Sequence, residues 1–322
     1  MRMPGKGKGM ARIRFIQDFL ATERAEGKAA ATLRNRRKVL EKLDKWLQSR
    51  DGKDDQTLTN ADLVAFINEL RERYTADGVN THISALRLYF RWMEEMGLRG
   101  DEQNPARRLK FQPVHPKPVE ALTPEDVRKL LVWANKAKKE RFGVYRSAVL
   151  SLLLLDTGLR VGEALGLKIG DVNMVEGRIL VKAKKTKSLR VVPISAAMQG
   201  QLRRFLAHRK LHFGKHDLRD EGWLFPAEHG RALLRDTAEA SMRQTSKDAD
   251  VPLLRPHKCR HTFARLSLMN GMPMSALMRI GGWKKLQTVA RYTDLNDEQC
   301  AQAHATTSPL VTLGRLGATP NK

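Results

Sequence analysis

Cysteine is scarce in this chain, because Cys259 and Cys300 are the only two among 322 residues. They are too few and too far apart to form a disulfide framework or a Cys-x-x-Cys metal site. The chain is therefore not a small secreted fold held together by disulfides. A reducing compartment fits this cysteine content.

Long apolar runs are also missing. The longest, VLSLLLL at 149–155, is far shorter than the about 18 residues that a membrane span needs. The first ten residues, MRMPGKGKGM, are basic but lack the apolar stretch of a signal peptide. These absences predict a cytoplasmic protein without a membrane anchor.

Acidic side chains are outnumbered by basic ones. The chain has 35 Asp and Glu against 59 Lys and Arg, which gives a formal net charge of +24 at pH 7. Such an excess is typical of proteins that bind polyanions, either nucleic acid or an anionic membrane surface. The 41% of hydrophobic residues is still enough to build a core in each of two domains.

Proline placement divides the chain. Three prolines fall within QPVHPKPVE at 112–120, a density that favours an extended linker over a helix. The expected parts are a basic flexible arm at 1–10, a helical domain at 11–111, a linker at 112–120, a second domain at 121–296 and a tail at 297–322.

Apolar periodicity predicts the secondary structure of both domains. Steps of three and four residues indicate four helices in the first domain. In the second, Thr123 is a predicted N-cap followed by Pro124 and an acid at position 126. One clear pair of strands is expected, around 179–181 and 190–194. The flanking segments 143–157, 197–211, 232–249 and 257–280 are predicted to be helical, so the fold is mainly α with a small sheet.

Two helices of the first domain are rich in basic side chains. A solvated basic face explains them as an alternative to nucleic-acid contact, but the charge of the whole chain favours contact. The candidates for DNA binding on these helices are Arg34, Arg36, Arg37, Lys38, Arg87 and Arg91.

The sequence gives little support for a metal site, a nucleotide-binding loop or a Ser-His-Asp catalytic triad. In PHKCRHTF at 256–263, His257, Cys259 and His261 match no common zinc spacing. On a helix, His257 and Cys259 would point to different faces. There is no Gly-rich phosphate loop and no G-x-S-x-G elbow. We therefore expect neither a metal nor another cofactor.

Two arginines stand out by their context. Phosphodiester chemistry without a metal needs fixed cations where negative charge develops, and the planar guanidinium suits that task. Arg160 lies in LDTGLRVGEALGL, where a buried helix should end at Gly158 and a short helix begin. Arg260 follows His257 by three residues, so both face one side of a helix, where His257 can move a proton near neutral pH. The alternatives are an Arg160–Glu163 surface pair and an ordinary helix-start histidine.

Four segments, in order, resemble the boxes of the tyrosine recombinase family, which includes phage integrases, Xer recombinases and Cre. They are TGLRVGEALGL at 157–167, KKTKSLRVVPI at 184–194, PHKCRHTFA at 256–264 and IGGWKKLQTVARYTDL at 280–295. The resemblance implies a catalytic domain at 121–296 and a helical, SAM-like core-binding domain at 11–111. The implied fold is mainly α, with two domains that form a C-shaped clamp around DNA.

The resemblance assigns roles to individual residues. Arg160 and Arg260 would hold the scissile phosphate, His257 beside them would act as acid or base, and Tyr292 matches the nucleophile. Glu163 matches an acidic position one turn after Arg160, from which it can hold that arginine in place.

The remaining assignments leave alternatives open. Lys185 corresponds to the lysine that protonates the leaving 5′-oxygen, but Lys184 and Lys187 crowd the same turn and are also candidates for DNA contact. Trp283 falls where many members have a second histidine, and either its indole N–H donates the same hydrogen bond or its ring only packs. His261 is interpreted as a structural or supporting residue.

The resemblance implies a site-specific DNA recombinase that cleaves and rejoins duplex DNA through a 3′-phosphotyrosyl bond, for integration, excision or resolution. It implies a homotetramer on a specific recombination site, a monomer or weak oligomer when free, and no cofactor. The 297–322 tail would contact a neighbouring protomer. The alternatives are DNA relaxation like that of a type IB topoisomerase and a non-catalytic DNA-binding protein.

Overall fold

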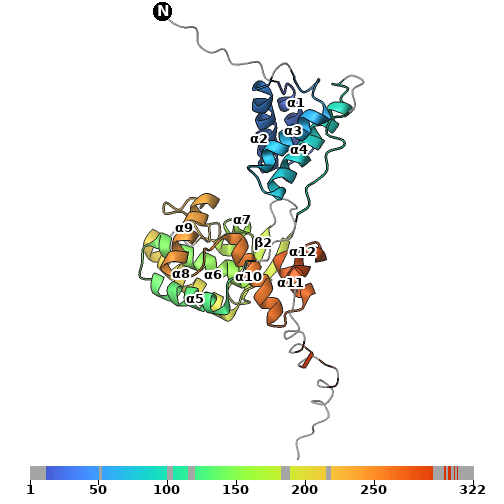
Figure 1. Ribbon diagram of the computed structural model, residues 1–322. Coiled ribbons are helices and arrows are strands. Elements are labelled where there is room, and N and C mark those ends of the chain that lie inside the picture. Colours follow the sequence, from blue (N-terminus) through green and yellow to red (C-terminus); the bar gives the residue numbers. More distant parts are fainter. Residues whose placement is uncertain are drawn as a thin grey trace, which may run out of the picture. The chain divides into compact units, whose positions relative to one another are not determined.

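The computed structural model of the chain describes residues 12–50, 53–99, 104–114, 120–182, 189–214 and 219–292, together with Ala301, His304, Ala305, Ser308 and Leu310. The chain divides into two compact units, Met1–Lys117 and Pro118–Lys322 (Figure 1). The division falls inside the proline-rich 112–120 segment. The arm expected at 1–10 and most of the tail expected at 297–322 lie outside the described residues.

The described part of the first unit contains four helices, as the apolar periodicity predicts. They are α1 Ile16–Ala25, α2 Ala30–Gln48, α3 Asn60–Arg71 and α4 Ala76–Glu95. Their apolar faces form one core, and a buried carboxylate joins the elements around it. Asp55 accepts hydrogen bonds from the Tyr89 hydroxyl and from the Arg14 backbone N–H, each at 2.7 Å.

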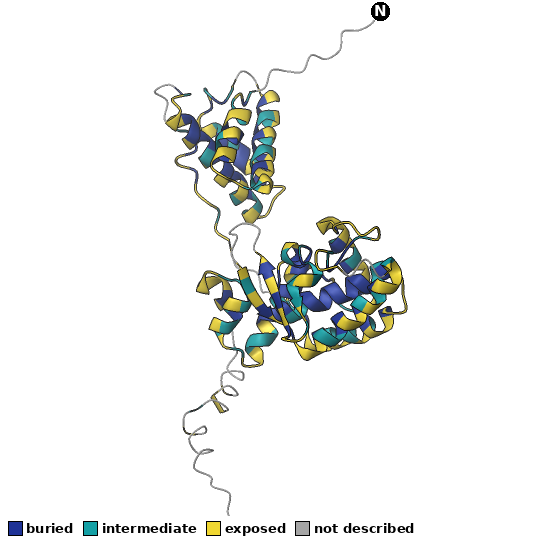
Figure 2. Ribbon diagram, turned by 180° about the vertical axis from the view of Figure 1, so that it is seen from behind, coloured by how far each residue is buried: buried dark blue, intermediate teal, exposed yellow. Residues whose placement is uncertain are grey.

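The second unit is built around one central helix, α6 Phe142–Thr157. It is apolar on all sides because other helices cover it on all sides. The longer helices in contact with it are α5 Pro124–Ala137, α8 Ala196–Phe213, α9 Arg235–Asp248 and α10 Pro256–Met269. Figure 2 shows buried residues concentrated inside each unit and exposed residues on its outside. The apolar run at 149–155 is thus part of a protein core, and none of the helices described is both long and apolar enough to cross a membrane.

A three-stranded antiparallel sheet packs beside these helices. Its order is β1 Val172–Asn173, β2 Arg178–Lys182 and β3 Leu189–Pro193, with Ile179 opposite Val192 in the β2–β3 register. The sequence predicts β2 and β3 but misses β1, because two residues are too few to show an alternating pattern. The turn that joins β2 to β3, residues 183–188, lies outside the described residues.

The prediction of helix over 257–280 is wrong in one respect, because the chain forms two helices there. α10 ends at Met269, and α11 runs over Met274–Gly281. Between them Gly271 adopts a φ of 85°, and Pro273 precedes α11. Proline has no N–H to continue the hydrogen bonds of a preceding helix, so α10 stops before it. A short helix, α12 Leu286–Ala290, follows α11 and was not predicted.

The end of α6 brings Arg160 close to α10. Gly158 caps α6 in the left-handed conformation, with a φ of 61°, as expected for a helix that ends there. A Cβ at this position would lie 2.2 Å from the Phe263 ring of α10, so only glycine allows the two elements to approach this closely. The chain then begins the short helix α7, Val161–Ala164, with Arg160 as its N-cap residue.

Candidate active site

Arg260 is the most buried charged group of the site, with 5% of its surface exposed. It lies on α10 and donates hydrogen bonds to two backbone carbonyls, to Gly158 at the end of α6 and, at 2.7 Å, to Gly281 at the end of α11. Burial first, and Arg160 next, lower its pKa to about 10. Arg260 is therefore still charged at neutral pH, and its other N–H groups can serve a ligand.

Arg160 is more accessible, because about half of its side chain is exposed. Its Nη1 donates to Glu163 Oε1 at 3.2 Å, and its backbone N–H donates to Glu163 Oε2 at 2.9 Å. Its Nη2 reaches the Gly282 carbonyl at 3.5 Å. One face of the guanidinium is thus fixed by the protein, while the side chain remains open to solvent.

Arg190 on β3 belongs to the same cluster, and the sequence analysis missed it. Its Nη1 and Nη2 donate to the two oxygens of Glu163 at 2.9 and 2.8 Å, and its Nε donates to the Ile280 carbonyl at 3.2 Å. Burial alone would raise the pKa of Glu163, but the hydrogen bonds from Arg190 and Arg160 hold that pKa below its ordinary value. Glu163 is therefore a charged link between the two arginines.

Three arginines thus bind three successive carbonyls at the end of α11. Arg190 binds Ile280, Arg260 binds Gly281 and Arg160 binds Gly282. The last carbonyls of a helix lack helical partners and carry the negative end of its dipole, so they are suitable acceptors for cations. This set of three contacts is called the carbonyl anchor below.

The two glycines allow this geometry. A Cβ on Gly281 would lie 1.9 Å from the Trp283 ring, and Gly282 has a φ of 68° with Arg190 Cζ 3.2 Å from an added Cβ. The chain therefore turns back on itself after α11. As a result, the Arg260 guanidinium lies over the Trp283 ring at 3.9 Å from its centroid. This stacking is what the structure shows for Trp283, and the hydrogen bond from its indole N–H to DNA stays a prediction.

Tyr292 follows α12 and is 8% exposed. Its hydroxyl lies 2.5 Å from Nδ1 of His261 on α10, and its ring centroid lies 6.1 Å from that of Trp283. Burial raises the pKa of Tyr292, although the positive charges of Arg291 and Arg260 act in the opposite direction. The contact with His261 was not foreseen from the sequence, where His261 was only a supporting residue.

Of the other predicted catalytic residues, His257 is among the described residues and the candidate lysines are not. His257 is exposed in the first turn of α10, and its ring centroid lies 6.5 Å from that of His261. Lys184, Lys185 and Lys187 lie outside the described residues. Arg160, His257, Arg260, Trp283 and Tyr292 therefore form the described part of the predicted catalytic set, and Glu163 and His261 contact members of it.

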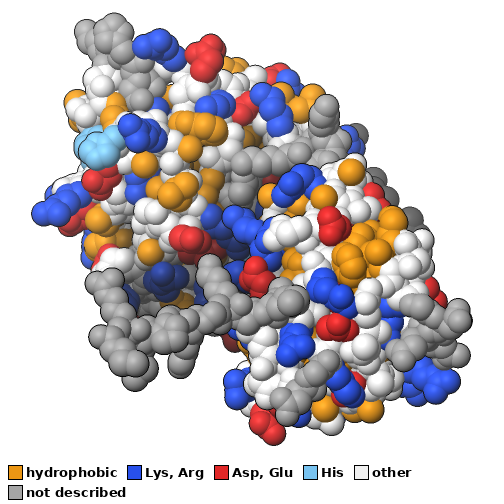
Figure 3. All heavy atoms as spheres, turned by 90° about the horizontal axis from the view of Figure 1, so that it is seen from above, with side chains coloured by type: hydrophobic (Ala, Val, Ile, Leu, Met, Phe, Trp, Pro, Cys, Tyr) orange, Lys and Arg blue, Asp and Glu red, His pale blue; other side chains and the backbone are white. Residues whose placement is uncertain are grey.

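The predicted DNA-binding residues of the first unit are not equivalent. Arg34 and Lys38 on α2 are exposed. Arg36 is instead paired with Glu23 of α1, and both side chains are largely buried. Lys and Arg side chains are spread over the visible face of the molecule with acidic ones among them (Figure 3).

The remaining candidates have neighbours of their own. Arg37 donates to Gln17 Oε1 at 3.1 Å, Arg91 lies 3.7 Å from Glu95, and the Arg87 guanidinium lies 5.4 Å from the centroid of the Phe111 ring.

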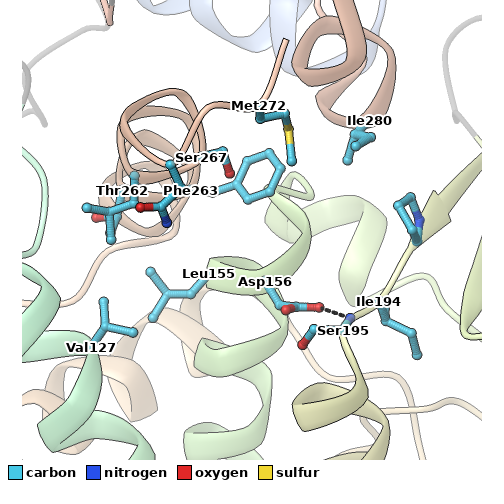
Figure 4. A pocket seen from close by; sticks show the side chains of 13 residues that line it. Val127, Leu155, Asp156, Ile194, Ser195, Thr262, Phe263, Ser267, Met272 and Ile280 are labelled. Atoms are coloured by element: carbon cyan, nitrogen blue, oxygen red, sulfur yellow. Dashed lines mark hydrogen bonds between the residues drawn. The ribbon is translucent and has the colours of Figure 1, made fainter. Parts of the chain in front are cut away.

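A cavity of about 410 Å³ lies near this cluster, between α5, the ends of α6 and β3, and the α10–α11 pair (Figure 4). Its lining is mainly apolar, and Asp156 within it accepts a hydrogen bond from the Ser195 backbone N–H at 3.0 Å. Neither the site arginines nor Tyr292 line it. The predicted chemistry is therefore located beside this cavity and not in it.

A cluster of fixed arginines in the same unit as a buried tyrosine fits an enzyme that acts on a phosphodiester. The model of the phage integrase family matches residues 120–299, and the model of the phage integrase N-terminal SAM-like domain matches residues 14–97. The first match alone spans more than half of the chain. The chain belongs to the phage integrase family.

Curated relatives and solved structures agree with this membership. Tyrosine recombinase XerD of Agrobacterium fabrum is 28% identical over 341 residues, which cover 97% of this chain and 98% of the relative. Tyrosine recombinase XerC of Roseiflexus castenholzii is 27% identical over 283 residues, which cover 87% and 88%.

Two solved structures share the fold at lower identity. XerH recombinase bound to palindromic difH substrate has a TM-score of 0.70 at 19% identity, over 88% of this chain and 82% of that one. The Tn1549 transposon integrase in complex with a circular intermediate DNA has a TM-score of 0.70 at 18% identity, over 91% and 99%. The predicted class, a tyrosine-type site-specific DNA recombinase with a mainly helical two-domain fold, is confirmed. The topoisomerase and non-catalytic alternatives gain no support from these relatives.

Proposed function

We propose that this recombinase cleaves and rejoins duplex DNA at a specific site with Tyr292 as its nucleophile. The observation that carries the proposal is the carbonyl anchor, which gathers three arginines directly before Trp283, itself nine residues before Tyr292. The Tyr292 oxygen would bond to phosphorus, and the bond from phosphorus to the 5′-oxygen would break. Attack by another 5′-hydroxyl on the resulting 3′-phosphotyrosyl bond would rejoin the DNA without an external energy source.

The arginines would supply the charge that this step needs. Arg260 and Arg160 each keep N–H donors for the non-bridging phosphate oxygens, and donors fixed in a partly buried site stabilise a developing anion strongly. His257, exposed at the start of α10, would exchange protons with the DNA or with solvent. Lys185 would protonate the leaving 5′-oxygen. Trp283 would support Arg260 through the stacked contact.

Recombination joins two duplexes, so we propose a homotetramer on synapsed DNA as the active assembly. Support comes from the same fold in a lambda integrase tetramer bound to a Holliday junction, which has a TM-score of 0.67 at 17% identity. The 297–322 tail is proposed to contact a neighbouring protomer.

We further propose that the exposed basic residues of α2 contact DNA phosphates. Arg34→Gln combined with Lys38→Gln should reduce the slope of log affinity against log salt by about 2, since each lost phosphate contact changes that slope by about 0.9. Fluorescence anisotropy on a duplex of random sequence at several salt concentrations measures it. Arg36→Gln should leave the slope unchanged and lower the melting temperature, because it leaves Glu23 without its partner. The opposite assignment of the two effects would rule out this contact surface.

Covalent trapping tests the proposed nucleophile. Cells that express the wild type, Tyr292→Phe or Tyr74→Phe are lysed in detergent, and any DNA that stays bound to the protein is sequenced. We expect covalent DNA with one recurrent sequence in the wild type and in Tyr74→Phe, which removes a hydroxyl from the first unit. Tyr292→Phe should give none. Covalent DNA that persists in Tyr292→Phe would disprove the assignment, and scattered sequences would disprove site specificity.

A further inference from the structure

His261 is the side chain in direct contact with the predicted nucleophile. Its Nδ1 lies 2.5 Å from the Tyr292 hydroxyl, and the two ring centroids are 5.5 Å apart. His261 follows Arg260 on α10, and adjacent helical residues point in different directions. Arg260 therefore turns to the carbonyls of Gly158 and Gly281, while His261 turns to Tyr292. One helix thus carries both a cation for a phosphate and a partner for the tyrosine.

From this contact we infer that His261 is the general base of DNA cleavage, which takes the phenolic proton of Tyr292 as the hydroxyl attacks phosphorus. The inference rests on the proposed role of Tyr292 and adds a catalytic residue to it. In the forward step the Tyr292 oxygen bonds to phosphorus and its proton moves to His261 Nδ1. The bond from phosphorus to the 5′-oxygen breaks, and this oxygen leaves with a proton from Lys185, the acid of the proposed function. In the rejoining step His261 returns the proton to the tyrosine oxygen.

The surroundings favour a neutral histidine that can accept this proton. Burial, followed by Arg291, His257 and Arg260, lowers the pKa of His261 below its ordinary value. At neutral pH the ring is then uncharged, and the tautomer with its hydrogen on Nε2 leaves a lone pair on Nδ1 for the tyrosine O–H. A proton on this ring would instead be repelled by the positive charges of Arg291 and Arg260.

Tyr292 needs such an acceptor because its own surroundings hold the proton. Burial raises the pKa of its hydroxyl, so the phenol ionises less readily than in water. Tyrosine and histidine therefore remain a neutral pair at rest. The proton moves when the new bond to phosphorus carries the negative charge towards the phosphate, where Arg260 and Arg160 stabilise it.

The geometry favours His261 over His257 as the base. His257 lies one turn earlier on α10, it is exposed, and its ring centroid is 6.5 Å from that of His261. A general base must lie within hydrogen-bond reach of the proton that it removes, and His261 does so. His257 remains suited to exchange protons with the DNA side of the site.

His261→Asn is the variant that tests the inference. Asparagine keeps a hydrogen-bonding atom near the position of Nδ1 but cannot take the proton. Single-turnover cleavage is measured on a nicked duplex that carries the sequence recovered by trapping, and on the same duplex with sulfur in place of the scissile 5′-oxygen. A thiolate leaves without a proton, so this second substrate restores variants that lack the acid but not variants that lack the base.

We expect His261→Asn to cleave both substrates about 100-fold more slowly than the wild type, with unchanged DNA affinity. The wild-type rate should rise with pH through the lowered pKa of His261, because the base must be deprotonated, and His261→Asn should lose this rise. Lys185→Ala should cleave the sulfur substrate at close to the wild-type rate, because this substrate does not need the acid. His229→Asn, which changes an exposed histidine away from the site, should match the wild type.

Two outcomes would overturn the inference. One is a cleavage rate for His261→Asn within a few-fold of the wild type, and the other is full recovery of this variant on the sulfur substrate, which would make His261 an acid. If the variant does not fold, the contact is tested in the wild type by NMR, with tyrosine labelled at ¹³Cζ and its chemical shift followed against pH. The chain has four tyrosines, and Tyr292→Phe assigns the signal. A Tyr292 signal that does not move as His261 titrates would disprove the contact. Covalent DNA in Tyr292→Phe would instead mean that the proposed nucleophile is wrong.

Discussion

Arg260→Lys should lower the rate of DNA cleavage about 1000-fold while DNA affinity changes little, the upper end of what the loss of one oxyanion donor costs. Lysine keeps the positive charge but presents it as a point. It cannot bind the carbonyls of Gly158 and Gly281 and a phosphate at the same time, and it has no planar group to stack on Trp283. Charge alone would therefore not replace Arg260.

The rate of single-turnover cleavage on a nicked duplex measures this effect. Arg265→Lys is the matched control, because Arg265 is exposed on the same helix, and it should leave the rate unchanged. A loss of less than about tenfold in Arg260→Lys would show that the site needs a charge but not the guanidinium geometry.

Arg190→Gln should lower the rate of DNA cleavage about 100-fold, although Arg190 is linked to Arg160 through Glu163. The substitution removes both hydrogen bonds to the largely buried Glu163 carboxylate and the bond to the Ile280 carbonyl. Glu163, the partner of Arg160, is then no longer held in place, and Arg160 can shift with it. A small displacement of a group that holds the reacting phosphate costs about 100-fold in rate. Single-turnover cleavage measures the loss, and Arg178→Gln, which breaks an exposed pair with Glu176, should cause none.

The pH dependence shows whether Arg190 acts through Glu163. In the wild type Glu163 has a lowered pKa, so its stabilising contribution is present at neutral pH and is lost as pH falls through that lowered pKa. Without Arg190, burial raises the pKa, and activity should fall at a higher pH than in the wild type. The double variant Arg190→Gln/Glu163→Gln should lose this shift and be more stable than Arg190→Gln alone, since no unpaired acid remains buried. An unshifted pH profile in Arg190→Gln would contradict the link.

The sequence located the elements of the site better than its contacts. Arg160 and Arg260 could be predicted because an arginine next to a buried helix is unusual unless it has a role there. The four segments that resemble the tyrosine recombinase family also occur in the expected order. The pairs Arg190–Glu163 and His261–Tyr292 are 27 and 31 residues apart, and no helix or strand period connects residues at such distances. The carbonyl anchor is formed by backbone atoms, which leave no mark on residue type apart from the two glycines that permit it.

The sequence did contain signals for two features that were not predicted, the break between α10 and α11 and the largely buried position of Arg36. Gly271 and Pro273 interrupt the 257–280 segment and mark the end of α10. Arg36 falls on the apolar stripe of α2, three residues after Leu33 and four before Leu40, which are both buried. Its position on that stripe distinguishes it from the exposed Arg34 and Lys38. Its partner Glu23 lies on another helix, so the ion pair itself could not be read from spacing.

The carbonyl anchor also bears on how this site can vary among related sequences. A substitution can remove a side chain that accepts a hydrogen bond, but a backbone carbonyl is present whatever residue carries it. The arginines would therefore keep these acceptors even where side chains of α11 were replaced. Gly281 and Gly282 are the exception, because a bulkier residue at either one moves the common support of all three guanidinium groups. For the support of the arginines, tolerance to substitution in this segment is thus set by the shape of the backbone at these two glycines.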